Sequence, residues 1–227
     1  MKTLLIKLAG TVNDPSLPTF GELKMAGAWA SSMSTSNYAA RAFQIKANEA
    51  LTLRVDGTGF FSKADYSGNL GQTLALAADT ETTVTMGLGG TYNFIIPNKY
   101  AITKINHGYS FYWRNVKLAD FGDMTYLEFL SLTNCQNNIT GKLSDLAALS
   151  KLTQLRFHSD STLITSITGT VKDLLHFPNL TTIDFYNCTG ITGDTSEIAD
   201  LHPNNGGKLA TFVRDNSGIT GTWPPSA

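Results

Sequence analysis

The chain has 227 residues, of which 42% are hydrophobic and 15% are charged, and its formal net charge is −1. This length holds one large domain or two smaller ones, and the apolar fraction is sufficient for a packed core. A nearly neutral chain lacks the basic surface that binds nucleic acid or an anionic membrane, so the composition argues against both partners.

The first residues, Met1–Lys7, begin like a secretory signal. Lys7 interrupts the apolar run after three residues, whereas a signal needs about 7–15 consecutive apolar residues. We interpret the segment as a β-strand. No stretch approaches the roughly 18 apolar residues of a transmembrane helix, so we expect no membrane insertion and a protein that is cytoplasmic or part of an assembly.

Residues 1–100 contain short runs of β-forming residues separated by turn residues. The runs are Thr3–Leu8, Arg41–Lys46, Leu51–Val55, Thr83–Met86 and Tyr92–Ile96. Turn residues follow at Asp56-Gly57, Ser67-Gly68-Asn69 and Gly89-Gly90. This pattern predicts a small antiparallel β-sandwich. The sandwich would also cover the first edge of the structure that follows it.

An aromatic run, Phe111-Tyr112-Trp113-Arg114, follows the junction between the two halves. Aromatic side chains carry large apolar surfaces, so we interpret the run mainly as a cover for the core at this junction. A binding role for the same cluster is the alternative.

The second half contains an internal repeat marked by the tripeptide Ile-Thr-Gly. The mark begins at Ile139, Ile167, Ile191 and Ile219, at spacings of 28, 24 and 28 residues. Periods of about 20–50 residues are typical of solenoids and other repeat architectures.

Apolar residues between these marks recur at offsets of 0, 3, 6, 9, 12 and 14 in three successive turns. They are Leu118, Phe121, Met124, Leu127, Leu130 and Leu132; Leu143, Leu146, Leu149, Leu152, Leu155 and Phe157; and Val171, Leu174, Phe177, Leu180, Ile183 and Phe185. The last offsets alternate like a strand with one buried face, and the first four suit a short helix or 3₁₀ segment. Ser144 is a candidate cap for such a helix. One turn buries too little to order its own backbone, so the turns must stack.

The final turn departs from this pattern. Pro203–Gly207 inserts a loop after Leu201, and Arg214 occupies a position that is apolar in the other turns. A polar terminal turn is expected where a stacked array meets water. Trp223 follows the last mark and is predicted to cap the open end of the core.

The two cysteines, Cys135 and Cys188, hold equivalent positions in turns that are two apart. Adjacent strands lie about 4.8 Å apart, so these residues are expected about 9–10 Å apart, too far for a disulfide. No second Cys or His lies at a metal-ligand spacing from either residue. We therefore predict two buried free thiols.

The segment Leu180–Gly193 follows the pattern L-x-x-L-x-L-x-x-[NCT] and ends in Ile-Thr-Gly. It resembles the leucine-rich-repeat family, most closely bacterial members whose turns end in Thr-Gly before Asp or Lys. The resemblance covers about residues 102–225 and implies recognition of a protein or glycan. The expected fold is therefore α+β and mostly β: an N-terminal antiparallel β-sandwich over residues 1–100, followed by a leucine-rich-repeat solenoid with a parallel sheet over residues 101–227.

The common catalytic and phosphate-binding signatures are absent from the sequence. His158 and Asp160 are the nearest approach to an acid–base pair, and we interpret them mainly as a surface pair. His107, His176 and His202 are scattered over different turns. The sequence therefore predicts no enzyme, no cofactor and no metal site.

Binding through the concave sheet is the predicted activity, because residues that alternate with the buried offsets point outward from adjacent strands. The candidate binding residues are Phe129, Ser131, Gln154, Arg156, His158, Asp184, Tyr186 and Val213. Phe, Arg and Tyr are types enriched at recognition surfaces. We expect a non-catalytic module that binds a protein or glycan. The alternative is an architectural subunit of a phage-like or cell-surface assembly, and a homo-oligomer is a candidate form of the protein.

Overall fold

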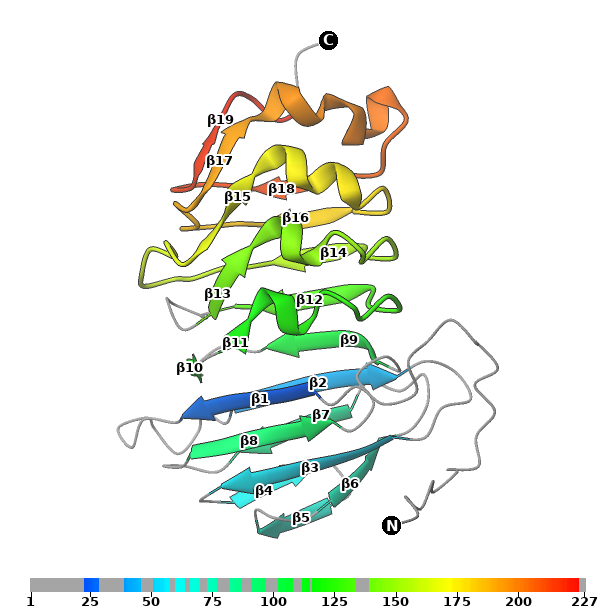
Figure 1. Cartoon of the computed structure of the whole chain (residues 1–227), viewed down its shortest axis with the longest axis vertical. Coiled ribbons are helices and arrows are strands. Elements are labelled where there is room, and N and C mark those ends of the chain that lie inside the picture. Colours follow the sequence, from blue (N-terminus) through cyan, green and yellow to red (C-terminus); the bar gives the residue numbers. More distant parts are fainter. Residues whose placement is uncertain are drawn as a thin grey trace, which may run out of the picture.

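The computed structural model in Figure 1 describes the strands between residues 23 and 96 (23–28, 39–45, 51–57, 60–63, 66–69, 73–76, 82–86 and 91–96) and residues 102–107, 112–114, 116–133 and 139–224. Side chains are described in residues 102–106, 116–133 and 139–224. All helices in these ranges are short 3₁₀ helices, and none has the length and apolar character needed to span a lipid bilayer.

From residue 102 onward the chain forms a repeat solenoid whose stacked turns contribute to two parallel sheets (Figure 1). The first set of parallel strands is β9 (Ile102–His107), β12 (Phe129–Leu132), β14 (Gln154–Arg156), β16 (Thr182–Asp184) and β18 (Thr211–Val213). The second set is β11 (Val116–Lys117), β13 (Ile139–Lys142), β15 (Ile167–Thr170), β17 (Ile191–Asp194) and β19 (Gly218–Thr220). Each of β11, β13, β15 and β17 leads directly into a 3₁₀ helix: η2 (Leu118–Asp120), η4 (Leu143–Leu146), η5 (Val171–His176) and η6 (Thr195–Leu201).

The apolar ladder predicted from the six offsets is confirmed. Every residue at those offsets in the three complete turns is at most 1% exposed. The strands of neighbouring turns pair in parallel, with Leu155 in register with Leu130 on one side and Ile183 on the other. Equal spacing along the chain therefore becomes one continuous core, in which the Phe157 and Phe185 rings stack with their centroids 5.6 Å apart.

The Ile-Thr-Gly mark forms the second parallel sheet, which the sequence analysis did not predict. The isoleucines of the first three marks are fully buried, whereas the threonines are exposed. The glycine has a positive φ, +145° at Gly169, and a Cβ built there would lie 3.0 Å from the Leu143 Cβ of the preceding turn. Glycine is thus required both by the backbone conformation and by close stacking.

Each 3₁₀ helix of the three regular turns begins with the same carboxylate contact. The Asp145 carboxylate accepts a hydrogen bond from the Lys142 backbone N–H at 2.8 Å, and Asp120 and Asp173 make equivalent bonds in their turns. The prediction that Ser144 caps this helix is wrong. The residue before η4 is Lys142, and its backbone N–H donates to the Asp145 carboxylate. An acidic group here satisfies a backbone N–H that the helix leaves unpaired.

The last turn closes the described end of the core with polar and aromatic side chains. Trp223 packs against the core beside Phe212, with ring centroids 5.4 Å apart, as predicted for a cap. Arg214 donates hydrogen bonds to the carbonyls of Ile219 and Gly221, at 3.5 and 2.7 Å. The arginine that breaks the apolar pattern therefore satisfies carbonyls of the final strand and the residues after it.

The predicted fold class is wrong, because the solenoid has two parallel sheets and the N-terminal strands do not form a sandwich of their own. Strand β2 (Ala39–Ile45) pairs antiparallel with β9, so one nine-stranded sheet runs in the order β18-β16-β14-β12-β9-β2-β7-β4-β5. We call it the long sheet, and its last three strands are β7 (Thr82–Met86), β4 (Phe60–Lys63) and β5 (Tyr66–Asn69). The remaining antiparallel sheet runs in the order β10-β1-β8-β3-β6 and takes its outer strand β10 (Tyr112–Arg114) from beyond β9. Its other strands are β1 (Leu23–Ala28), β8 (Thr91–Ile96), β3 (Leu51–Gly57) and β6 (Thr73–Leu76). Both sheets thus join strands from the two halves of the chain.

The N-terminal strands were predicted in part. Four predicted runs match β2, β3 (Leu51–Gly57), β7 (Thr82–Met86) and β8 (Thr91–Ile96), whereas Ser67-Gly68-Asn69, predicted as a turn, lies in β5 (Tyr66–Asn69). The predictions missed β1 (Leu23–Ala28), β4 (Phe60–Lys63) and β6 (Thr73–Leu76). The run Thr3–Leu8 and the side chains of the aromatic run lie outside the described residues. The division into domains at residues 1–100 and 101–227 stays a prediction.

Cys188 is a buried thiol outside any disulfide, as predicted, and it donates a hydrogen bond to the Phe157 carbonyl oxygen, 2.7 Å from its Sγ. Cys135 lies outside the described residues.

Candidate functional site

The candidate binding residues lie on or next to the parallel strands of the long sheet. Their side chains alternate with the buried ladder, and strand register aligns them in columns across the turns. One column contains Lys104, Phe129, Gln154, Thr182 and Thr211, and the next contains Asn106, Ser131, Arg156, Asp184 and Val213. His158 and Tyr186 follow the ends of β14 and β16. We call this surface the sheet face.

Most of the predicted residues reach this surface, but one does not. Phe129, Gln154, Arg156, His158, Asp184, Tyr186 and Val213 are partly exposed. Ser131 is only 2% exposed and is therefore removed from the candidate surface.

Phe129 lies between two cationic side chains. The Lys104 Nζ is 4.7 Å from the centre of the Phe129 ring, and the Arg156 Cζ is 5.8 Å from it. Cations near an aromatic face are attracted by the ring quadrupole, so this part of the surface has a positive, aromatic character. Lys104 was not among the predicted binding residues, although it lies between the buried Ile102 and Ile105 on β9.

His158 contacts carboxylates through both ring nitrogens. Its Nε2 lies 2.8 Å from Asp160 Oδ1, and its Nδ1 lies 3.0 Å from Asp184 Oδ2 in the next turn. The expected surface pair of His158 with Asp160 is therefore present, with a second carboxylate added. Since a carboxylate accepts hydrogen bonds, both contacts are satisfied at once only when both ring nitrogens carry protons.

The surroundings of His158 favour its charged form. Partial burial acts to lower the pKa of His158, but the hydrogen bonds to Asp160 and Asp184 and the charges of both carboxylates outweigh it, so the pKa lies above its ordinary value of 6.5. Tyr186 stacks on the imidazole, with ring centroids 4.9 Å apart and planes 19° apart. The ring is thus held in one orientation by contacts from two turns.

Arg156 lies next to Asp184 in register, yet the two do not form an ion pair. Both Asp184 oxygens lie within 3.1 Å of His158 Nδ1, and Asp184 Oδ1 also accepts a hydrogen bond from the Tyr186 backbone N–H. The Arg156 guanidinium instead donates to Gln154 Oε1 at 3.1 Å. Its Nε is buried and has no hydrogen-bond partner among the described residues.

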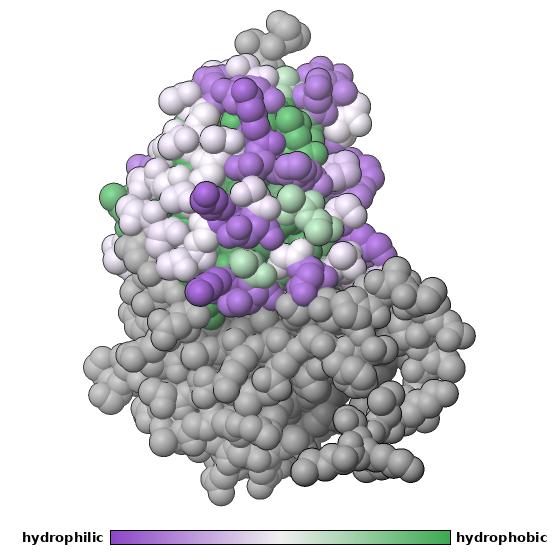
Figure 2. Space-filling model, in the orientation of Figure 1, coloured by the Kyte–Doolittle hydropathy of each residue, from purple (hydrophilic) through white to green (hydrophobic). Residues whose placement is uncertain are grey.

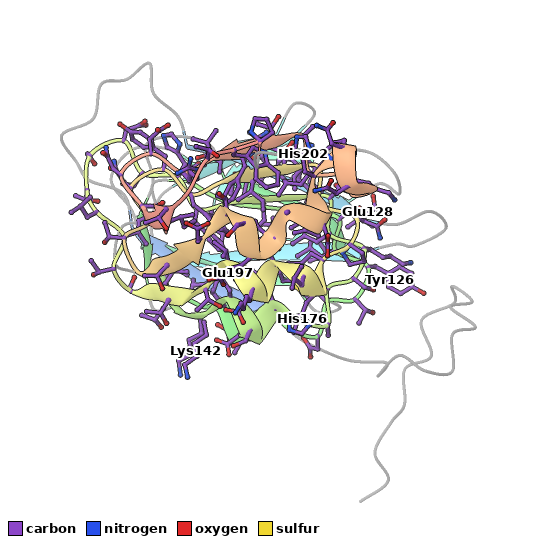
Figure 3. All side chains as sticks on the ribbon, turned by 90° about the horizontal axis from the view of Figure 1, so that it is seen from above. Tyr126, Glu128, Lys142, His176, Glu197 and His202 are labelled. Atoms are coloured by element: carbon purple, nitrogen blue, oxygen red, sulfur yellow. The ribbon has the colours of Figure 1, made fainter. Side chains whose placement is uncertain are left out.

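The opposite side of the solenoid, formed by the second sheet and the 3₁₀ helices, has a different surface, which we call the helix side. Figure 2 shows it as hydrophilic and neutral, with apolar atoms in small separate areas. Figure 3 shows Lys142, His176 and Glu197 on this side. No cluster of three or more His, Cys, Asp or Glu residues suited to a metal ion occurs in the described ranges.

Comparison of the chain with models of known protein families, with curated proteins and with solved structures finds no match.

Proposed function

We propose that the chain is a leucine-rich-repeat recognition module without catalytic activity, and that it binds a protein or glycan through the sheet face. The observation that supports this proposal is the set of aromatic, cationic and anionic side chains that strand register aligns on neighbouring turns. A packed ladder beneath them already holds their positions, so these residues lose little conformational freedom when a partner binds.

The sheet face also has the residue types that contribute most at protein interfaces. Phe129, Arg156 and Tyr186 come from three successive turns and are partly exposed. Arg and Tyr are prominent among the few interface residues whose truncation weakens binding strongly. The helix side instead repeats Ile-Thr-Gly in four turns, and this set of residues serves the turn geometry.

The test compares variants of the two sides in one binding experiment. Full-length wild type, Arg156→Ala/Tyr186→Ala and the helix-side control Lys172→Ala/Leu175→Ala are immobilised, and captured proteins and glycan-array binding are measured. We expect a ligand that the wild type and the control retain and that the sheet-face variant loses. A ligand that the sheet-face variant retains at full level would contradict the proposal.

The architectural alternative has one observation in its favour, the continuity of the long sheet through both halves of the chain. Light scattering separates the two functions: a stable trimer favours an architectural subunit, and a monomer with a selective ligand favours recognition.

A further inference from the structure

We infer that Arg156 is a docking site for a carboxylate side chain of a partner protein, and that His158 keeps this site open by holding Asp184. The inference rests on the proposed function, because it names the chemistry of the partner at the sheet face.

The first step is the unsatisfied guanidinium. Arg156 has a neutral partner in Gln154, and its buried Nε has no partner among the described residues. The buried Nε cannot be reached from outside, so a docked carboxylate would meet the outer guanidinium nitrogens of this partly exposed side chain. A carboxylate matches the planar fork of a guanidinium and binds it with two parallel hydrogen bonds.

The second step is the choice of partner. The Arg156 guanidinium lies beside Phe129, on whose ring the Lys104 ammonium also lies at 4.7 Å. Two cations around one aromatic ring complement an acidic side chain flanked by apolar groups, a surface that proteins present. A partly exposed Arg next to an aromatic residue is also a frequent centre of binding energy between proteins.

The third step is the competition for Asp184. Adjacent parallel strands place the Asp184 and Arg156 backbones about 4.8 Å apart, so Asp184 is the nearest carboxylate that register offers to Arg156. Charged His158 holds Asp184 through Nδ1 while its Nε2 contacts Asp160. Loss of the proton removes the positive charge of the ring and one of its two donors, which weakens its hold on Asp184 and lets Asp184 pair with Arg156 and fill the site.

In the described turns, charged and titratable groups lie near His158 in its own turn and in the turns that follow. Arg156 and Asp160 belong to the same turn as His158, and Asp184 and Tyr186 belong to the next turn. One turn further, Asp215 holds the position that His158 and Tyr186 hold in their turns. In the preceding turn Ser131 and Thr133 are buried and do not titrate. The two carboxylates that contact His158 therefore govern its charge.

The experiment titrates the full chain with a triglutamate peptide and follows binding by calorimetry or by chemical shifts of the sheet-face residues. We measure binding at about pH 6, at about pH 8.5 and at steps between them, and expect it to weaken roughly tenfold or more as the His158 ring loses its proton. Arg156→Gln should abolish binding at both pH values, and Arg156→Lys should weaken it because the fork is lost. The helix-side control Lys172→Gln should bind like the wild type.

Asp184→Asn tests the role of His158 directly. Without the competing carboxylate, the peptide should bind at about pH 8.5 nearly as well as at about pH 6. An unchanged pH dependence in this variant overturns the gating by His158. Thermal unfolding of each variant confirms that it is folded.

Other outcomes overturn the inference in full. These are no binding at either pH, equal binding of a triglutamine peptide, binding that survives Arg156→Gln, and binding of oligogalacturonate without binding of triglutamate. A captured partner could fail to bind Arg156→Ala/Tyr186→Ala and yet bind Arg156→Gln like the wild type, without competition from triglutamate. This result would overturn the inference but not the proposed function.

Discussion

The two sides of the solenoid share one core but differ in how strongly the backbone geometry restricts the types of their outward-facing residues. On the helix side four turns repeat a buried Ile, an exposed Thr and a Gly with positive φ, and the three regular turns repeat the carboxylate that caps the 3₁₀ helix. On the sheet face the outward residues differ from turn to turn, as in the column of Lys104, Phe129 and Gln154. Sharp turns impose residue types, whereas an extended strand leaves its outward side chains free to vary.

The largest expected change in the free energy of unfolding is for a residue of the shared core, in comparison with a residue of the sheet face. Phe157 is fully buried and stacks on Phe185, so Phe157→Ala should lower the free energy of unfolding by about 3–5 kcal/mol, measured by denaturant titration. The control Phe129→Ala, at a partly exposed sheet-face position, should lower it clearly less. Equal losses would mean that the sheet face carries as much of the packing as the core.

The next effect tests the constraint on the helix side. Gly169→Ala introduces a Cβ 3.0 Å from Leu143 at a φ of +145° and should destabilise the protein by roughly 1–3 kcal/mol. Gly206→Ala is a matched control, since its φ is also positive at +90° but no atom lies within 4 Å of the new Cβ. The difference between the two variants measures the close stacking, and no difference would refute it.

A smaller effect concerns the charge on the sheet face and its dependence on pH. The folded protein raises the pKa of His158 above 6.5, so the stability from this group is fully present below about pH 6.5 and is lost as the pH rises through the folded value. His158→Gln should remove this part of the decline in the unfolding free energy. His176→Gln, at an exposed residue of the helix side, is the control for replacing a histidine elsewhere in the solenoid. A His158→Gln profile that overlays the wild type would argue against the two carboxylate contacts.

The smallest effect is expected for an ion pair of the helix side. Lys172 Nζ lies 3.5 Å from Glu197 Oε2, and the two side chains are 66% and 33% exposed. Exposed pairs of this kind contribute about 0–1 kcal/mol, so Lys172→Ala should change the unfolding free energy by less than about 1 kcal/mol. A loss of several kcal/mol would show that this side depends on its charges as well as on its turns.

The core of the solenoid was predictable because its signal is local and periodic. Leu143, Leu146 and Leu149 recur at the offsets of the turns before and after them, and burial follows directly from that spacing. The second sheet was missed because its strands span only two to four residues, too few for an alternation to be seen. The pairing of β2 with β9 joins segments more than fifty residues apart in sequence, and no local pattern encodes that register.

The candidate site was predictable as a surface but not as a set of contacts. Alternation with the ladder placed Arg156, His158 and Asp184 on one face. It did not show that Asp184 contacts His158 rather than Arg156, because that choice depends on side-chain rotamers and on Asp160. Burial of Ser131 likewise depends on its neighbours on the sheet and not on its own position in the repeat.

Strand β9 has an antiparallel neighbour, β2, on one edge and a parallel neighbour, β12, on the other. At β9 the long sheet therefore changes from antiparallel pairing to the parallel stacking of solenoid turns. Each later turn packs mainly against the turn immediately before it. A chain with this layout can gain or lose whole turns beyond β12 while its antiparallel strands keep the same partners. The length of the sheet face can therefore change in evolution independently of the antiparallel strands at its other end.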